Sequence, residues 1–217
     1  MLFTWSFSSL KDFVNCPRQY NEIKVLKNYT KRATEQMLYG TVVHKVCEDY
    51  VGEGKPLAKN YEHFKPVLDS LLEIPGLRLP EHKMALDEDG KACQYGKGYK
   101  VRGIVDLLVV DGETAYIVDY KTGSNKYPDP KQLKLMALMT FAHFPDVKHI
   151  KAGLLFIVHN SFMDEEYKRE QIDELWGHFK GDLQRLQAAF DTGVWNPNRT
   201  PLCGWCPVTG CEFHKDR

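Results

Sequence analysis

Two short apolar segments separated by Asp111-Gly112 constrain the fold of this chain more than any other feature. Residues 105–110 and 115–118 are rich in β-branched and large apolar side chains, which favours buried strands. Asp-Gly between two such segments is among the strongest short signals for a β-hairpin. One carboxylate, Asp106, lies inside the first segment, and Asp119 directly follows the second. Because buried charge is costly unless it is paired or binds a metal, we expect these two residues to have a function.

The turn allows the relative positions of the two carboxylates to be predicted. With a two-residue loop at Asp111-Gly112, Asp106 lies opposite Ile117 and is a diagonal neighbour of Asp119 on one face, roughly 7–8 Å away. A four-residue loop would place Asp106 and Asp119 directly opposite each other. Either even-length loop gives one face with two carboxylates, and the period of two along a strand adds Lys121 to that face. Only a loop of odd length with a bulge would break this arrangement.

Two close carboxylates and a lysine form a chemically coherent set. Carboxylate oxygens are hard ligands that suit Mg²⁺ or Mn²⁺. A metal ion bound there can activate a water molecule and stabilise negative charge on a phosphoryl oxygen, while an ammonium group orients that water or neutralises the charge. The alternative is a surface hairpin in which an aspartate and Lys121 form a cross-strand pair.

The run Gly103-x-x-Asp106, followed by Asp119-Tyr120-Lys121-Thr122-Gly123, resembles the motif of the PD-(D/E)xK nuclease superfamily, most closely its RecB-like and Cas4-like branch. The resemblance implies a restriction-endonuclease-like fold, in which a mixed β-sheet is flanked by helices. It also implies a metal-dependent DNA exonuclease that hydrolyses phosphodiester bonds and favours single-stranded DNA or free ends. Asp106, Asp119 and the carbonyl group of Tyr120 would bind Mg²⁺ or Mn²⁺, and Lys121 would act on the attacking water.

Three further residues match the pattern of the RecB-like nucleases. Gly40-x-x-x-His44 resembles their first motif, in which the imidazole joins the metal ligands, and Glu81 stands where many members have a further metal or water ligand. Gln132 matches the first position of a Gln-x-x-x-Tyr motif, but the fourth residue after it is Met136, so the resemblance gives a role to the glutamine alone. Without the resemblance, His44 would be an ordinary partly buried histidine, Glu81 a solvated side chain and Gln132 an exposed amide.

Three closely spaced cysteines, Cys203-x-x-Cys206-x-x-x-x-Cys211, predict a metal site near the end of the sequence. Two residues are candidates for the fourth ligand. His214 would complete a Cys₃His zinc site, whereas Cys16 would complete a four-thiolate site suited to a [4Fe–4S] cluster. Cys16-Pro17-x-x-Tyr20 resembles the early cysteine motif of Cas4-like and AddB-like nucleases, and Cys203-Gly204-Trp205-Cys206-Pro207 resembles their late motif. The resemblance favours the cluster, which would close the C-terminal segment onto the N-terminal helix.

Length and composition set the remaining bounds. The chain has 217 residues, which suits a single nuclease domain over 1–217, with an N-terminal helical part at about 1–75, a catalytic core at about 80–160, and a C-terminal helix and cysteine cluster at about 165–217. The formal net charge is zero, so DNA binding would need a local basic patch. No apolar run approaches the ~20 residues of a membrane span, and we expect a cytoplasmic protein without membrane contact.

The hydrophobic periodicity predicts helices, three strands, a helix, a strand and a final helix. The expected helices cover residues 6–20, 37–51, 61–72, 129–144 and 172–190, and the expected strands cover 80–86, 99–110, 114–120 and 150–158. Ser8 or Ser9 is expected to cap the first helix, and Gly193 to end the last. This order of elements is similar to the mixed α/β core of the nuclease superfamily.

Scattered basic and aromatic side chains are candidates for contacts with DNA. Backbone contacts are expected from Arg18, Lys97, Lys100, Arg102, Lys126 and Lys131, and stacking on unpaired bases from Tyr20, Tyr120 and Tyr127. Two other functions stay open, namely a non-catalytic DNA-binding or assembly subunit and an iron–sulfur redox sensor built on this fold. Partners besides DNA would be further copies of the chain or a larger DNA-processing complex.

Overall fold

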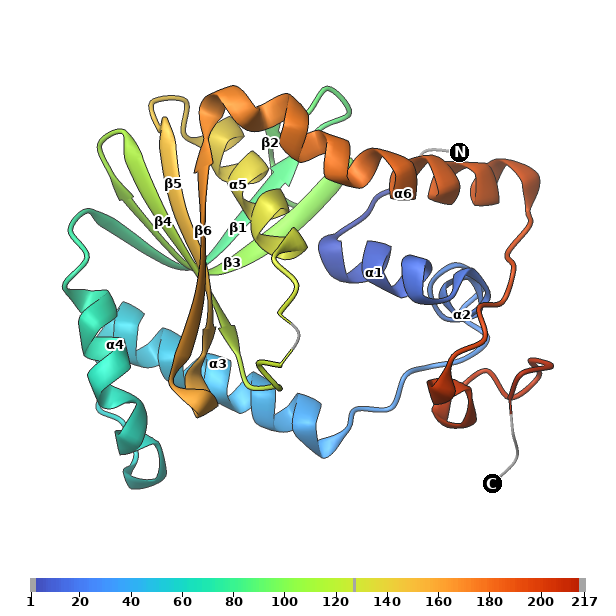
Figure 1. Cartoon of the computed structure of the whole chain (residues 1–217), viewed down its shortest axis with the longest axis horizontal. Coiled ribbons are helices and arrows are strands. Elements are labelled where there is room, and N and C mark those ends of the chain that lie inside the picture. Colours follow the sequence, from blue (N-terminus) through green and yellow to red (C-terminus); the bar gives the residue numbers. More distant parts are fainter. Residues whose placement is uncertain (1–2, 127, 215–217) are drawn as a thin grey trace. The chain divides into compact units, whose positions relative to one another are not determined.

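The structure, a computed structural model, describes residues 3–126 and 128–214 of the chain (Figure 1). The chain forms two compact units. We call residues 34–176 the sheet unit, and residues 1–33 with 177–217 the cysteine unit. The expectation of a single nuclease domain stays a prediction.

The helices and strands follow the predicted order with two additional strands. The helices are α1 (Phe7–Asn15), α2 (Pro17–Tyr20), α3 (Glu35–Glu53), α4 (Lys65–Leu72), α5 (Lys131–His143) and α6 (Ile172–Thr192). The strands are β1 (Leu77–Leu86), β2 (Ala92–Cys93), β3 (Val101–Asp111), β4 (Thr114–Lys121), β5 (His149–Phe156) and β6 (Ser161–Lys168). In the described part of the chain, no helix is both long and apolar enough to cross a membrane.

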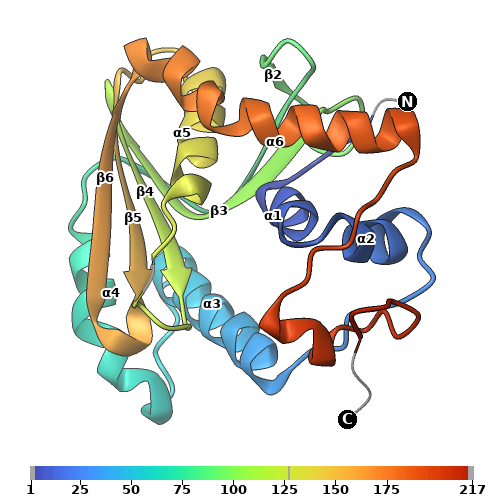
Figure 2. The same cartoon turned by 45° about the vertical axis from the view of Figure 1, so that its right-hand side comes forward.

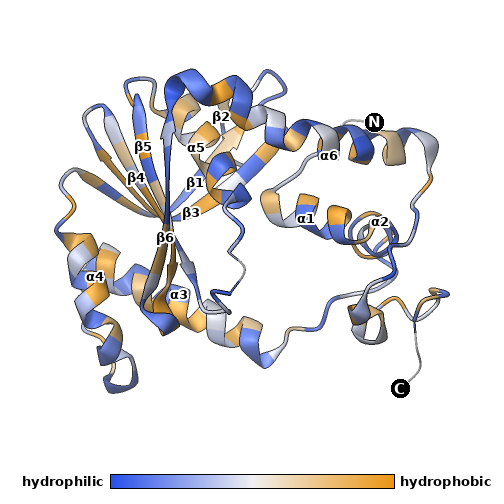
Figure 3. Ribbon diagram, viewed as in Figure 1, coloured by the Kyte–Doolittle hydropathy of each residue, from blue (hydrophilic) through white to orange (hydrophobic). Residues whose placement is uncertain are grey.

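Six strands of the sheet unit form one mixed sheet in the order β2-β1-β3-β4-β5-β6. β4 and β5 are parallel, whereas the other neighbouring pairs are antiparallel. The hydrophobic periodicity does not predict β2 or β6. β2 has only two residues, and β6 is a polar edge strand, largely hydrophilic in Figure 3, so neither presents the apolar pattern of a buried strand.

Helices cover both faces of this sheet (Figure 2). Consecutive residues of β4 point to opposite faces. Val118 and Tyr120 pack with side chains of α3 and α4, whereas Asp119 accepts a hydrogen bond from Gln132 of α5. α3 and α4 therefore lie on one face and α5 on the other, which leaves β4 between two helical layers.

The alternation of side chains along β3 changes phase near Asp106. Gly103 faces α5, because a Cβ atom added to this glycine would lie 3.0 Å from the sulfur of Met139. Leu107 packs instead with side chains of α3 and α4, although residues four apart in a regular strand share a face. The irregularity coincides with Glu81 of β1, which lies across from Asp106 in the register of the two strands and has a φ of 46°.

The β3–β4 hairpin turns one residue later than the sequence predicts. Asp111 pairs with Thr114, so the two-residue loop is Gly112-Glu113 rather than Asp111-Gly112. Gly112 has a φ of 55°, and a positive φ at the first loop position suits the primed turns of hairpins. The resulting register places Asp106 level with Asp119 instead of diagonal to it, as expected for a four-residue loop.

The first predicted helix is interrupted at Cys16. Ser6 caps α1 through a reciprocal pair of hydrogen bonds with Ser9, so the predicted caps at Ser8 or Ser9 are wrong. Cys16 has extended backbone angles, and Pro17 begins the short helix α2, because proline suits the first helical turn. A similar interruption divides the helix expected over 61–72, whose first part is a 3₁₀ helix.

Candidate active site

Three side chains from three different elements meet in an open cleft of the sheet unit. His44 of α3, Glu81 of β1 and Asp106 of β3 each offer one ligand atom, and these atoms all lie within 4.8 Å of one another. In residues 3–126 and 128–214, no other group of three or more His, Cys, Asp or Glu side chains has this spacing. The cleft has a volume of ≈ 810 Å³, and all three side chains line it.

Asp106 connects this group to the neighbouring strand and to α3. Its Oδ1 lies 3.3 Å from Nδ1 of His44, and its Oδ2 accepts a 2.7 Å hydrogen bond from the backbone N–H of Tyr120. Burial alone would lower the pKa of His44, but the hydrogen bond with Asp106 and the charges of Asp106 and Asp119 outweigh burial and raise it. The cleft therefore attracts positive charge.

Glu81 reaches the same cleft through an uncommon backbone conformation. Glu81 lies inside β1. Its φ of 46° is in the left-handed region, which residues other than glycine rarely adopt. Burial and the nearby charge of Asp106 raise the pKa of Glu81. Such strained residues persist where the surrounding structure holds them, and they concentrate at functional sites.

A second group, formed by Asp119, Lys121 and Gln132, lies on the α5 side of β4. Nε2 of Gln132 donates a 2.7 Å hydrogen bond to Oδ1 of Asp119, and Nζ of Lys121 donates a 2.9 Å hydrogen bond to Oε1 of Gln132. Nζ of Lys121 also forms an ion pair with Oδ2 of Asp119. Gln132 thus fixes both charged partners at once.

Asp119 is only 2% exposed, and its environment favours the protonated form. Burial raises the pKa of Asp119 to about 6, although the ammonium of Lys121 opposes the shift and the charge of Asp106 adds to it. The sequence places Asp119 among the metal ligands. In the structure, the charge of Asp106 helps to raise the pKa of Asp119, but Asp119 does not belong to the group of His44, Glu81 and Asp106.

Gly40 permits the close approach of α3 to the loop after β4. A Cβ atom added to Gly40 would lie 3.2 Å from Oγ1 of Thr122, which is tighter than most packed contacts. Thr122 and Gly123 line the cleft together with His44, one helical turn after Gly40. The small residue therefore helps to bring the imidazole to the carboxylates.

The sequence matches the family profile of the PD-(D/E)XK nuclease superfamily over residues 62–211. The chain belongs to this superfamily. The chain is similar to a solved structure from Eubacterium rectale, of a protein whose assignment as an exonuclease is itself a prediction. The two structures superpose with a TM-score of 0.54 at 14% identity, and the match covers 94% of this chain and 86% of that one. This match shows a common fold, and it confirms the predicted restriction-endonuclease-like architecture.

A second solved structure, of LHK-Exo in complex with dAMP, has a TM-score of 0.45 at 13% identity and covers 88% of this chain and 91% of that one. No curated protein matches the sequence at a significant level.

This member of the superfamily has no tyrosine on α5 at the position where the resemblance expects one. Met136 occupies it and is 4% exposed. Its side chain belongs to the apolar core around α5. Of the two positions of the Gln-x-x-x-Tyr motif, Gln132 is therefore the one that contacts Asp119 and Lys121.

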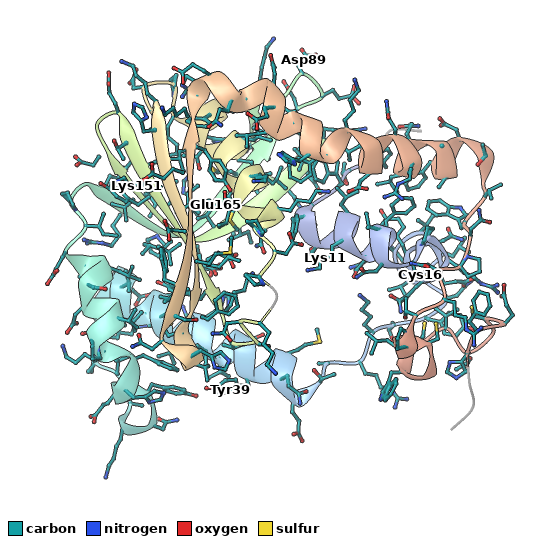
Figure 4. All side chains as sticks on the ribbon, viewed as in Figure 1. Lys11, Cys16, Tyr39, Asp89, Lys151 and Glu165 are labelled. Carbon is teal, nitrogen blue, oxygen red and sulfur yellow. The ribbon has the colours of Figure 1, made fainter. Side chains whose placement is uncertain are left out.

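The four cysteines expected to bind a cluster line one small cavity of ≈ 20 Å³ in the cysteine unit, together with His214. Cys16 lies beside the C-terminal segment (Figure 4). Its Sγ accepts hydrogen bonds of 3.4 Å from the backbone N–H groups of Gln19 and Asn198. The side chain of Gln19 donates a 3.1 Å hydrogen bond to Sγ of Cys206. In the part of the chain that the structure describes, none of the six cysteines forms a disulfide.

Two of the predicted stacking contacts with DNA are wrong. Tyr20 is 5% exposed and Tyr120 is 1% exposed, so neither ring is available to a base. Arg18 forms a 2.6 Å ion pair with Glu212 and donates a hydrogen bond to the carbonyl of Gly210, and its contact with DNA stays a prediction. Tyr127 lies outside the described residues.

The predictions for the exposed residues Lys97 and Arg102 stay open. Sequence reasoning does not identify Ile104 or Thr41, which also line the cleft. Residue type alone gives no signal for either. Ile104 reaches the cleft because of the direction in which side chains of β3 point, and Thr41 because α3 packs close to the sheet.

Proposed function

We propose that this chain is a metal-dependent DNA nuclease that hydrolyses phosphodiester bonds, with His44, Glu81 and Asp106 as the first ligands of Mg²⁺ or Mn²⁺. The observation that carries the proposal is the convergence of these three ligand atoms in one open cleft. Membership of the PD-(D/E)XK nuclease superfamily supports phosphodiester hydrolysis as the reaction. The site residues also include Asp119, Lys121, Gln132 and the carbonyl group of Tyr120.

The donor set suits a hard divalent cation. Two carboxylates and one imidazole supply oxygen and nitrogen ligands, and the imidazole makes Mn²⁺ a natural substitute for Mg²⁺. Burial and the charge of Asp106 raise the pKa of Glu81, and the hydrogen bond with Asp106 raises that of His44, which supports a site that a bound cation would stabilise. A bound divalent ion would supply an activated water and stabilise negative charge on the phosphoryl oxygen.

Lys121 is the candidate for orienting the attacking water or neutralising charge on the phosphate. Its ammonium is held by Gln132 and Asp119, so its position does not depend on the substrate. Asp119 forms an ion pair with Lys121 and would approach the ion beside Asp106. Asp119 would thus link the residues that bind the cation with Gln132 and Lys121.

We further propose that Cys16, Cys203, Cys206 and Cys211 bind a [4Fe–4S] cluster. Four thiols around one cavity support this assignment. Ligands of a single tetrahedral zinc ion lie about 4 Å from one another, given Zn–S bonds of about 2.3 Å, and no set of three among the described cysteines and His214 is that close. Sulfurs that bind different irons of a cluster lie further apart. The cluster would stabilise the fold by linking distant parts of the chain.

The substrate would be DNA with a free end, preferably single-stranded. The test compares linear single-stranded DNA labelled at either end with a closed circle of the same sequence, using protein purified without oxygen in Mn²⁺ or in EDTA. Mn²⁺-dependent degradation of the linear form alone, releasing label from one end first, supports an exonuclease. Nicking of the circle at a similar rate would indicate an endonuclease instead of an exonuclease. No hydrolysis of either form would reject the proposal.

A further inference from the structure

A basic and aromatic patch lies on the sheet unit, on strands that also build the cleft. It consists of Lys83 of β1, Tyr95 and Tyr99 of the β2–β3 connection, and Arg102 of β3, and we call it the tyrosine–arginine patch. The guanidinium of Arg102 lies 5.7 Å from the ring centre of Tyr95 and 5.3 Å from that of Tyr99. Nζ of Lys83 lies 6.0 Å from the ring centre of Tyr95. The patch therefore combines two aromatic rings with two cations.

The backbone of the connection explains why both tyrosines reach one guanidinium. The sequence is Tyr95-Gly96-Lys97-Gly98-Tyr99, and Gly96 and Gly98 have φ values of 126° and 70°. These angles favour glycine and turn the chain back within a few residues. Lys97 lies between the two tyrosines in the sequence, is exposed, and adds a third positive charge to the patch.

The positive charges of the patch have no carboxylate partner. In the described part of the chain, none of Lys83, Lys97 and Arg102 forms an ion pair. By contrast, Lys100 in the same connection lies 3.9 Å from Glu88. The positive charge of the patch is therefore not neutralised by neighbouring carboxylates. Such a local excess of positive charge suits an anionic partner.

The patch is continuous with the cleft along β3. Arg102, Ile104 and Asp106 follow the period of two, so their side chains share a face, and Ile104 is exposed and lines the cleft. Lys83 lies level with Ile104 on β1. Four residues of strand span about 13 Å, roughly the length of four stacked nucleotides at about 3.4 Å each.

We propose that the tyrosine–arginine patch binds single-stranded DNA next to the cleft, so that the strand runs along β3 from the patch to Asp106. Unpaired bases stack on Tyr95 and Tyr99, and Arg102 and the two lysines contact phosphates. Only a single strand exposes base faces to aromatic rings, so the patch selects unpaired DNA. This inference rests on the proposed function, because it names the substrate form that the same site receives.

The test measures DNA binding and hydrolysis separately in the full-length protein purified without oxygen. Three variants are compared with the unchanged protein: Arg102→Ala, the double substitution Tyr95→Ala with Tyr99→Ala, and the control Lys151→Ala. Lys151 is exposed on β5 (Figure 4). Binding of labelled single-stranded and blunt duplex DNA is followed by anisotropy in EDTA. Hydrolysis is followed in Mn²⁺ with long DNA and with bis(p-nitrophenyl) phosphate, which is too short to reach the patch.

The patch variants should bind single-stranded DNA about 5- to 100-fold more weakly but hydrolyse the small diester at the unchanged rate. Arg102→Ala should also reduce the salt dependence of binding by about one phosphate contact. Lys151→Ala should behave as the unchanged protein.

Unchanged affinity for single-stranded DNA in folded patch variants would overturn the inference, and so would an equal loss of affinity for duplex DNA. A lower unfolding temperature of Arg102→Ala with normal DNA binding would show that the cation–π contacts only stiffen the connection, which also overturns it. If the unchanged protein hydrolyses neither substrate, the proposed function fails, whereas the binding measurements still decide the inference.

Discussion

Glu81 lies across from Asp106 on the adjacent strand, and the two residues mark the point at which the alternation of side chains changes phase. The change lets Asp106 point into the cleft beside His44, while the next residue of β3 joins the core under α3 and α4. Regular alternation back from Leu107, which packs under α3 and α4, would turn Asp106 toward α5 and away from His44. The metal site therefore depends on a backbone irregularity.

The left-handed conformation of Glu81 makes a prediction about stability without metal. In EDTA, Glu81→Gly should be more stable than Glu81→Ala by about 1 kcal/mol, because glycine adopts a positive φ without a Cβ clash. Denaturant unfolding of both variants measures the difference. At the neighbouring position His82, which lacks a positive φ, the alanine variant should be the more stable one. A glycine variant at position 81 that is less stable than the alanine variant would contradict this account.

Gln132 should affect the reaction rate more than DNA affinity. Gln132→Leu removes one acceptor from Lys121 and one donor from Asp119, so the ammonium loses its fixed position. We expect roughly tenfold slower hydrolysis with unchanged DNA binding, since small misplacements of a catalytic group are costly. The control is Gln187→Ala on α6, where the side chain donates a hydrogen bond to Asp191. Equal rates for Gln132→Leu and the unchanged protein would reject this role.

The raised pKa of Asp119 predicts how stability without metal depends on pH. The unfolded carboxyl titrates near 3.8 and the folded one near 6, so its favourable contribution is present below pH 3.8 and is lost as the pH rises through 6. Asp119→Asn should therefore gain stability relative to the unchanged protein between pH 4 and 7, by on the order of 1–3 kcal/mol.

Thermal unfolding in EDTA across this pH range measures that gain. Asp164→Asn, at an exposed position of β6, should show no such trend. A stability difference between Asp119→Asn and the unchanged protein that is constant or shrinks with rising pH would contradict the assigned burial of this carboxylate.

The two readings of the cysteine cavity differ in which substitution removes the metal. With a [4Fe–4S] cluster, Cys16→Ser should lose iron and acid-labile sulfide, and His214→Ala should keep both. With zinc at Cys203, Cys206, Cys211 and His214, the effects of the two substitutions would be reversed, and zinc would replace iron in the metal analysis. Cys93→Ser, in the sheet unit, serves as the matched control and should change neither.

The sequence predicts the strands around the site well, because the apolar segments and the glycine turn are local signals. It misses the register of the hairpin because Asp-Gly suggests a loop at those two residues, whereas Gly112 takes the positive φ at the first loop position. It also misses the phase change at Glu81, since a non-glycine residue with a positive φ leaves no pattern in the sequence.

The candidate site shows the same limit. The resemblance names His44, Glu81 and Asp106, and the structure brings them together. The residues of the tyrosine–arginine patch are scattered over β1, β3 and a glycine-rich connection, so their proximity follows only from strand pairing. Tyr20 and Tyr120 show the opposite case, because residue type suggests stacking on DNA whereas tertiary packing buries both rings.

The most direct test of the central claim compares the unchanged protein with Asp106→Ala in DNA cleavage and DNA binding. Both proteins, purified without oxygen, are given end-labelled single-stranded DNA in Mn²⁺ and in EDTA. We predict Mn²⁺-dependent cleavage by the unchanged protein, and its loss in Asp106→Ala with DNA binding retained. Cleavage by Asp106→Ala at the unchanged rate, or no cleavage by an unchanged protein with intact metal content, would contradict a nuclease centred on His44, Glu81 and Asp106.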